Sequence, residues 1–309
     1  MHRQTLEVPY SPKPIQCTLS WPEETKNRED RESPSPTPVL IFTHGAGGTL
    51  SSDAIANFSA GFAVHAPILC FQGNMNLKSR VKMYSCVIEN QSFSMCLGGR
   101  SMGARAAVMA ATDATERLVL VSYPLHTGKE TRDEILLDLA QSVKVIFVIG
   151  SRDSMCGLGQ LEDVRSKMKC KTWLVVVEEA DHGMSVKPKS GTEAVGKMTG
   201  EVVANWIDEC EEKKTEGRIT WKGEEERAEW SGWSEVSADV VAQPPQKKET
   251  PVQDPEDAIA ATQDQPSKRS KSKRSKSTGK KTPAEEAVSG RRGLSWSCKG
   301  MSPRKRIKR

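Results

Sequence analysis

The stretch LGGRSMGARAA, residues 97–107, decides how the rest of the chain is interpreted. An apolar segment over residues 93–97 runs into the pattern Gly-x-Ser-x-Gly, and a helix of small residues is predicted directly after it. A serine on a sharp strand-to-helix turn needs glycines around it, because the backbone there leaves no room for Cβ atoms. Gly99 and Gly103 stand in those places, so Ser101 is the candidate nucleophile.

The position of Ser101 before a predicted helix also suits this chemistry. Free backbone N–H groups and the helix dipole favour negative charge at a helix N-terminus. Short patterns such as Gly-x-Ser-x-Gly occur by chance in many chains, so the rest of the sequence must supply the partners.

Composition divides the 309 residues into three parts. Residues 213–309 carry 23 Lys and Arg against 14 Asp and Glu, whereas residues 1–212 carry 22 against 26. We expect a mildly acidic domain over 1–212, which is long enough for one buried α/β core. A Trp-containing extension over 213–242 and a disordered basic tail over 243–309, rich in Pro, Gln, Lys, Ser and Asp, are predicted to follow.

The alternation of apolar runs and helical patterns predicts a mostly parallel sheet with helices on both faces, preceded by an N-terminal hairpin. The last helix is predicted to begin with a Ser-x-x-Glu capping box at Ser190. Strands are expected at 6–8, 15–19, 39–43, 68–71, 93–97, 118–122, 145–149 and 172–177, and helices at 52–64, 80–89, after 101, near 133–140, at 158–168 and at 190–210.

The strand predicted at 39–43 ends in the glycine-rich turn His-Gly-Ala-Gly-Gly, residues 44–48. In an α/β hydrolase, the loop after the third strand and the residue after the nucleophile each supply one N–H of the oxyanion hole. Ala46 and Met102 are therefore the candidate donors. A phosphate-binding loop is the competing interpretation, but neither Gly-Lys-Ser/Thr nor Gly-x-Gly-x-x-Gly is present.

The order Ser101, Asp153, His182 is that of an α/β-hydrolase triad, with Asp153 and His182 following predicted strands. The imidazole would take the serine proton, and a buried carboxylate would orient the imidazole. Each residue also has an ordinary role as a loop, turn or cap residue. His44 and His126 are the other candidate bases, expected instead to shape the oxyanion turn and to line the pocket.

Four motifs together resemble the α/β-hydrolase-like family of testis-expressed protein 30 and the third regulatory subunit of the non-specific lethal histone acetyltransferase complex. The resemblance covers roughly residues 5–210 and implies a compact core related to dienelactone hydrolases, with the triad at Ser101, Asp153 and His182. It names no substrate, and one branch of the family is a chromatin-complex component. The motifs are THGAGG (43–48), GGRSMGARAA (98–107), VSYPLH (121–126) and ADHGM (180–184).

Two connections stand out beside this resemblance. The connection over 89–92, before the elbow strand, is shorter than is usual in the family. The short link from Tyr123 to Asp133 leaves no room for a substantial cap domain, so we expect an open site for small or extended substrates.

Other features limit cofactors, partners and location. The eight cysteines form no Cys-x-x-Cys pair and no metal-ligand spacing with histidine, so we expect reduced core thiols, no metal and no cofactor. No run approaches the roughly 20 apolar residues of a membrane span. No signal peptide is recognised, and we expect a nuclear or cytoplasmic protein rather than a secreted one.

The C-terminal part leaves two questions open. Tryptophans at 221, 230 and 233 suit either an extra hairpin or exposed anchors for a partner. Basic clusters at 268–281 and 304–309 are typical of nuclear localisation or nucleic-acid patches, and equally of a solvated tail. Sequence-specific DNA recognition is not expected, because no recognition helix or zinc finger is present.

The leading hypothesis is a serine hydrolase acting on an ester or thioester. The alternative is an inactive hydrolase fold that serves as an interaction module in a nuclear chromatin-regulatory complex, whose basic tail contacts chromatin proteins or other acidic partners.

Overall fold

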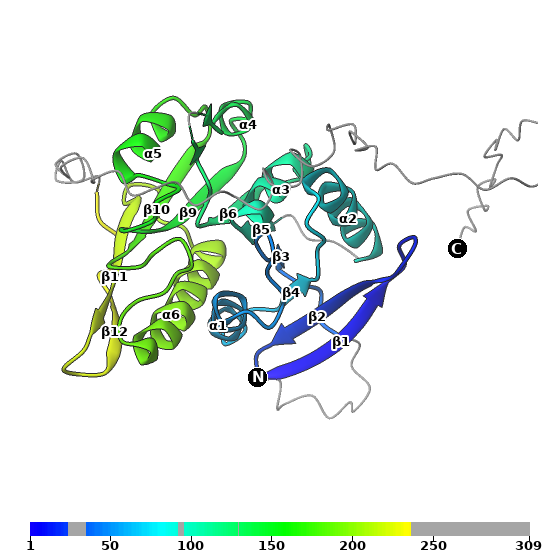
Figure 1. The fold of residues 1–309 in the computed structure, drawn as a ribbon, viewed down its shortest axis with the longest axis horizontal. Helices are drawn as coiled ribbons and strands as arrows, with labels where there is room; N and C mark the ends of the chain where they lie inside the picture. Colours follow the sequence, from blue (N-terminus) through cyan, green and yellow to red (C-terminus); the bar gives the residue numbers. More distant parts are fainter. Residues whose placement is uncertain (24–34, 92–95, 129, 236–309) are drawn as a thin grey trace, which may run out of the picture. The chain divides into compact units, whose positions relative to one another are not determined.

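A computed structural model of the chain describes residues 1–23, 35–91, 96–128 and 130–235, and within them one ten-stranded sheet dominates (Figure 1). Its order is β1-β2-β4-β3-β5-β6-β9-β10-β11-β12. The strands from β4 to β11 are parallel, whereas β1, β2 and β12 pair antiparallel. The strands are β1 (His2–Val8), β2 (Ile15–Trp21), β3 (Leu40–Thr43), β4 (Ile68–Phe71), β5 (Cys96–Arg100), β6 (Arg117–Val121), β9 (Lys144–Gly150), β10 (Lys171–Val177), β11 (Glu216–Lys222) and β12 (Arg227–Trp230).

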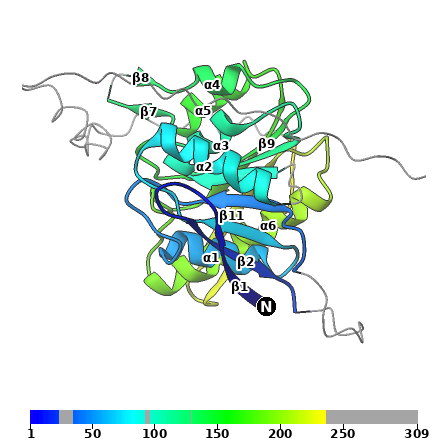
Figure 2. The ribbon, with the colours of Figure 1, turned by 90° about the vertical axis from the view of Figure 1, so that its right-hand side faces the viewer.

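Helices cover both faces of this sheet, as Figures 1 and 2 show from two directions. Two helices, α1 (Asp53–Phe62) and α6 (Lys189–Asp208), share one apolar core with one side of the strands. The other core contains residues of α2, α3, α4 and α5. These helices are α2 (Leu77–Asn90), α3 (Met102–Ala110), α4 (Glu134–Leu137) and α5 (Leu158–Arg165). The predicted class, a mostly parallel sheet between two helical layers, is confirmed.

The central strands are apolar at consecutive positions because each of their faces is covered. Phe147 of β9 belongs to the core beneath α2 to α5, and its neighbours Ile146 and Val148 belong to the core beneath α1 and α6. All three side chains are fully buried. Since successive strand residues point to opposite faces, this pattern requires a sheet buried on both sides.

Close contact between α1 and α6 depends on small residues where the helices cross. A Cβ on Gly200 would overlap the carbonyl oxygen of Phe58 and would lie 2.5 Å from the backbone nitrogen of Phe62. Gly61 of α1 is packed in the same way against the backbone of Lys197. The two backbones therefore meet directly, with no side chain between them at this point.

The predicted capping box at Ser190 is wrong. The N-cap of α6 is Pro188, and Ser190 lies in the first turn of the helix. The hydroxyl of Thr192 instead ties the preceding loop to the helix, accepting from the N–H of Val186 at 3.1 Å and donating to its carbonyl at 3.0 Å. A threonine in the first turn thus anchors the preceding loop to the helix, and no side chain caps the first N–H groups of α6.

The Trp-containing extension forms two further strands of the main sheet over its described part, up to residue 235. β11 runs parallel to β10, and β12 returns antiparallel beside it. Trp221, Trp230 and Trp233 are partly buried against the core beneath α6, so of the two alternatives the hairpin is the one observed. Residues 236–242 and the predicted basic tail over 243–309 lie outside the described residues.

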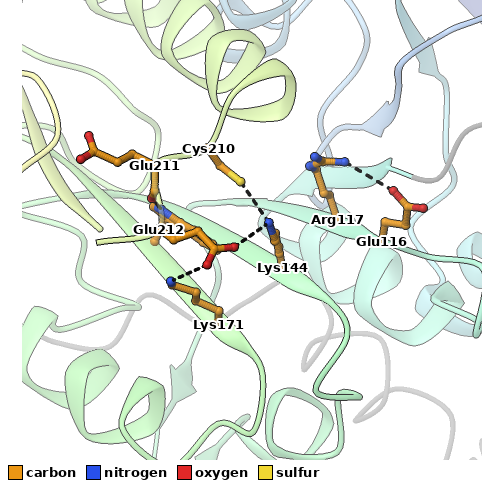
Figure 3. Close-up of polar contacts among 8 residues, drawn as sticks. Glu116, Arg117, Lys144, Lys171, Cys210, Glu211 and Glu212 are labelled. Atoms are coloured by element: carbon orange, nitrogen blue, oxygen red, sulfur yellow. Dashed lines mark hydrogen bonds and ion pairs between the residues drawn. The ribbon is translucent and has the colours of Figure 1, made fainter. Parts of the chain in front are cut away.

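Polar contacts tie the segment after α6 to the amino ends of two strands (Figure 3). The Lys144 ammonium lies 3.3 Å from Cys210 Sγ and 3.3 Å from the Glu212 carboxylate. Lys171 lies 3.8 Å from the same carboxylate, and both ammonium groups lie over the ring of Trp173. Exposed ion pairs contribute little stability each, so we assign this cluster the role of fixing where the chain enters β11.

Seven cysteines within the described residues are free thiols. Burial raises the pKa of Cys17 and of Cys70 to about 12. No helix in the described ranges is long and apolar enough to cross a membrane.

The crossing of α1 and α6 predicts opposite effects for two glycine substitutions. Gly200→Ala should lower the free energy of unfolding by about 1–3 kcal/mol, because its methyl group meets backbone. Gly159→Ala in α5 has nothing within 4 Å and should raise that free energy by up to about 1 kcal/mol through helix propensity. Urea denaturation measures both, and equal effects of the two substitutions would contradict the direct backbone contact.

Candidate active site

Ser101 occupies a strained turn between β5 and α3. Its φ is 52° and its ψ is −119°, a combination that few residues other than glycine adopt. The turn is held by a hydrogen bond of 2.9 Å from the Ser101 N–H to the carbonyl of Val121, on β6. Gly103 lets α3 approach the end of β3, because a Cβ there would lie 2.6 Å from the carbonyl oxygens of Thr43 and His44. This geometry is that of a nucleophile elbow.

Ser101, Asp153 and His182 come together at the carboxyl ends of β5, β9 and β10. The Ser101 hydroxyl lies 3.0 Å from His182 Nε2. On the other side of the ring, His182 Nδ1 lies 2.9 Å from both carboxylate oxygens of Asp153. The carboxylate is fully buried, whereas the imidazole is 21% exposed. One continuous hydrogen-bonded chain therefore runs from a buried acid to a partly buried serine.

Backbone contacts fix both partners of the serine. The N–H of Met155 donates to Asp153 Oδ1 at 2.8 Å, so the carboxylate accepts from its own turn as well as from the imidazole. The Arg100 guanidinium, from the residue just before the serine, donates to the backbone carbonyl of His182 at 2.5 Å. The loop that carries the histidine is thereby attached to the strand that carries the nucleophile.

The glycine-rich turn after β3 lies against the elbow. A Cβ on Gly45 would lie 3.2 Å from the Cβ of Ser101, so Ala46, the next residue, is close to the serine. Met102 is the first residue of α3, and its N–H has no acceptor within the helix. The two predicted oxyanion-hole residues thus flank Ser101 on neighbouring segments.

His44 holds this turn in place rather than acting on the serine. It is almost completely buried, and its Nε2 accepts from the N–H of Gly73 at 3.0 Å. Since Nε2 is the acceptor, Nδ1 carries the proton and donates to the Gly45 carbonyl at 2.7 Å. Burial, then the charge of Arg80, lowers the pKa of His44 to about 4. The imidazole is consequently neutral at ordinary pH.

The other candidate histidine, His126, and the aspartate beside His182 have different surroundings. His126 is half-buried, and burial lowers its pKa while the charge of Asp153 opposes that shift. The backbone N–H of His126 donates to the carbonyl of Met155, so His126 lies beside the turn that carries Asp153. Asp181 accepts from the N–H of Ser185 at 3.0 Å and shapes its own loop. Within the described ranges, no group of three or more His, Cys, Asp or Glu side chains could hold a metal ion.

The segment between β6 and β9 is short. In its described part it contains the two-residue strands β7 (His126–Thr127) and β8 (Glu130–Thr131), which pair with each other, and the single turn of α4. No inserted domain lies in this described segment.

Comparison with known proteins places this arrangement. Residues 72–208 match the model of a family described as an α/β-hydrolase domain. The fold is that of an α/β hydrolase. The match begins just after β4 and ends with α6, so it includes all three residues of the hydrogen-bonded chain.

Solved structures with a similar fold cover about two thirds of the chain. Est1E from Butyrivibrio proteoclasticus, in a structure with ferulic acid bound, aligns with a TM-score of 0.51 and 14% identity, over 66% of this chain and 100% of that one. An esterase from Pyrobaculum calidifontis aligns with a TM-score of 0.50 and 12% identity, over 67% of this chain and 84% of that one. At such low identity these similarities concern the fold alone.

Two arginines near the nucleophile elbow were not predicted from the sequence to belong to the site. Arg100 fills a variable position of Gly-x-Ser-x-Gly, so the motif itself gives no signal for it. Arg80 is fully buried in α2, where the sequence suggests only a helical residue. Both bind backbone carbonyls of loops that are distant in sequence, a type of contact that periodicity does not reveal.

The buried, neutral His44 predicts a pH-dependent stability. Its pKa of about 4 in the folded state lies below the ordinary value of 6.5, so the unfolded chain binds more protons between these values. Its contribution is complete above pH 6.5 and is lost as the pH falls toward 4, by about 3 kcal/mol in total. His44→Asn should flatten the dependence of the unfolding free energy on pH in this range.

Urea denaturation of wild type and His44→Asn at several pH values from 4 to 7 measures the effect. His65→Asn, at an exposed position, is the control for loss of a histidine. Parallel curves for wild type and His44→Asn would contradict the neutral, buried state of His44.

Proposed function

We propose that this α/β hydrolase is a serine hydrolase that cleaves a carboxylic ester or thioester. The observation that carries the proposal is the hydrogen-bonded chain from buried Asp153 through His182 to Ser101. A hydroxyl is a weak nucleophile until a neighbouring base takes its proton, and the imidazole lies at the required distance. The family match and the similarity in fold to esterases support the same class.

The acylation step follows from these positions. Ser101 Oγ attacks the carbonyl carbon of the substrate while His182 Nε2 takes the hydroxyl proton. Asp153 stabilises the imidazolium, and its contact with Nδ1 holds the proton-accepting nitrogen toward the serine. The N–H groups of Ala46 and Met102 stabilise the negative charge on the former carbonyl oxygen. The imidazolium then protonates the leaving alkoxide or thiolate as its bond to carbon breaks.

Deacylation repeats this sequence with water as the nucleophile. His182 takes a proton from water, the resulting hydroxide attacks the acyl-enzyme, and the carboxylic acid leaves as Ser101 recovers its proton. The short segment between β6 and β9 leaves the imidazole partly exposed, which favours small or extended acyl groups.

Labelling with a fluorophosphonate probe tests the nucleophile. Wild type should be labelled on the peptide that contains Ser101, and Ser101→Ala or His182→Ala should abolish labelling. Ser185→Ala, an exposed serine three residues from the histidine, is the matched control and should be labelled at the wild-type rate. A folded wild-type protein that stays unlabelled would refute the proposal.

Turnover of short-chain p-nitrophenyl esters and acyl thioesters tests the acid. Asp153→Asn keeps the shape of the side chain but removes its charge, so kcat should fall on the order of 10⁴-fold. Circular dichroism and thermal denaturation check that the variant remains folded. A fall in kcat of less than tenfold would argue against Asp153 as the group that orients His182.

A further inference from the structure

We infer that Arg80 is a positioning residue that holds the Ala46 N–H of the oxyanion hole toward Ser101. The inference rests on the proposed hydrolase function and assigns a role to a residue of α2 that does not touch the serine. This role is supported by the contacts of the guanidinium, by the geometry of the peptide that it binds and by the location of that peptide.

The guanidinium of Arg80 is fully buried and binds backbone carbonyls. Its Nη1 donates to the carbonyl of His44 and, at 3.4 Å, to that of Gly45, while its Nη2 donates to the carbonyl of Asn74. One cation thus joins the turn after β3 to the turn after β4. The imidazole of His44 reinforces this link, because it donates to the Gly45 carbonyl and accepts from Gly73.

The bound carbonyls determine where the following N–H groups point. In a trans peptide the C=O and the N–H of the same peptide unit point in opposite directions. The Gly45 carbonyl is directed to Arg80 and to His44 Nδ1, so the Ala46 N–H is directed away from them. The same carbonyl also accepts from the Gly48 N–H at 3.4 Å. Rotation of this peptide would require all these hydrogen bonds to break in a buried site, which costs free energy.

The location of the peptide connects this orientation to the reaction. Gly45 is packed against the Cβ of Ser101, so the peptide that follows it borders the space beside the serine. A hydrogen bond to a charged donor also polarises the peptide, which strengthens its N–H as a donor on the other side. Arg80 and His44 together therefore hold the direction of one oxyanion-hole donor, and the charge of Arg80 adds to its strength.

Variants of Arg80 separate positioning from mere stabilisation. Arg80→Lys retains a positive charge but lacks the forked geometry that reaches several carbonyls, and Arg80→Met removes the donors altogether. Arg165→Met is the matched control. Arg165 is also a buried arginine, but it pairs with Glu216 and Glu162 at 2.7 Å each, near the amino ends of β10 and β11 and away from the serine.

The readouts are kcat and KM for a short ester, the rate of fluorophosphonate labelling, and the inhibition constant of a matching trifluoromethyl ketone. The ketone forms a hemiketal oxyanion on serine and so reports on the oxyanion hole. Loss of one such donor lowers kcat by about 10²–10³-fold. We expect a fall of this order for Arg80→Met and a smaller one for Arg80→Lys, with KM changed less than threefold. The inhibition constant should rise in parallel with the loss of kcat/KM.

The Arg165→Met variant should lose thermal stability yet keep kcat and the inhibition constant within about twofold of wild type. Folded Arg80 variants with wild-type kcat and ketone affinity would overturn the inference, while labelling of wild type would leave the proposed function standing. Failure of both Arg80 variants to fold, with Arg165→Met folded, would also overturn it in favour of a purely structural role. An unlabelled wild type would instead refute the proposed function, and the inference with it.

Discussion

The strained backbone of Ser101 is the constraint on which the rest of the site depends. A φ of 52° in a residue with a Cβ costs about 1–3 kcal/mol, so it persists only where surrounding contacts impose it. Those contacts come from two strands: β6 accepts the serine N–H, and the end of β3 packs against Gly103. Because β3, β5 and β6 are adjacent parallel strands, the sheet register itself holds the turn.

The acid and the base depend on a second set of contacts, between loops. The turn after β9 and the loop after β10 are joined by a hydrogen bond of 2.9 Å from the Arg152 N–H to the carbonyl of Ala180. Arg100 then attaches the His182 backbone to the nucleophile strand. Three segments from separate parts of the chain are therefore locked together before any substrate binds, and this preorganisation is what the proposed proton transfers require.

The sequence was sufficient for features that are local and periodic. Consecutive apolar residues such as Ile146 to Val148 predict a strand buried on both faces, and glycines around Ser101 predict the sharp turn. The pattern at Ser190 was misleading because the helix begins one residue earlier, at Lys189, with Pro188 as its N-cap. The environment of Trp221 could not be predicted either, since it depends on β11 joining β10 and on Gly191 of α6, whose Cβ position the indole ring fills.

The two buried arginines make contacts beside the serine that could not be predicted from the sequence. Arg80 and Arg100 both lower the pKa of His44, so the positive field of both cations reaches the turn after β3. Arg80 binds the His44 carbonyl of that turn, and Arg100 binds the carbonyl of His182 and interacts electrostatically with Asp153 and Asp181. Burial is the main reason that the pKa of His44 is low, and the field of the two arginines adds to it. The same field favours negative charge beside Ala46. At His182 the carboxylate of Asp153 offsets this positive field, so the proposed mechanism can place a proton on His182 and negative charge on the oxyanion at the same time.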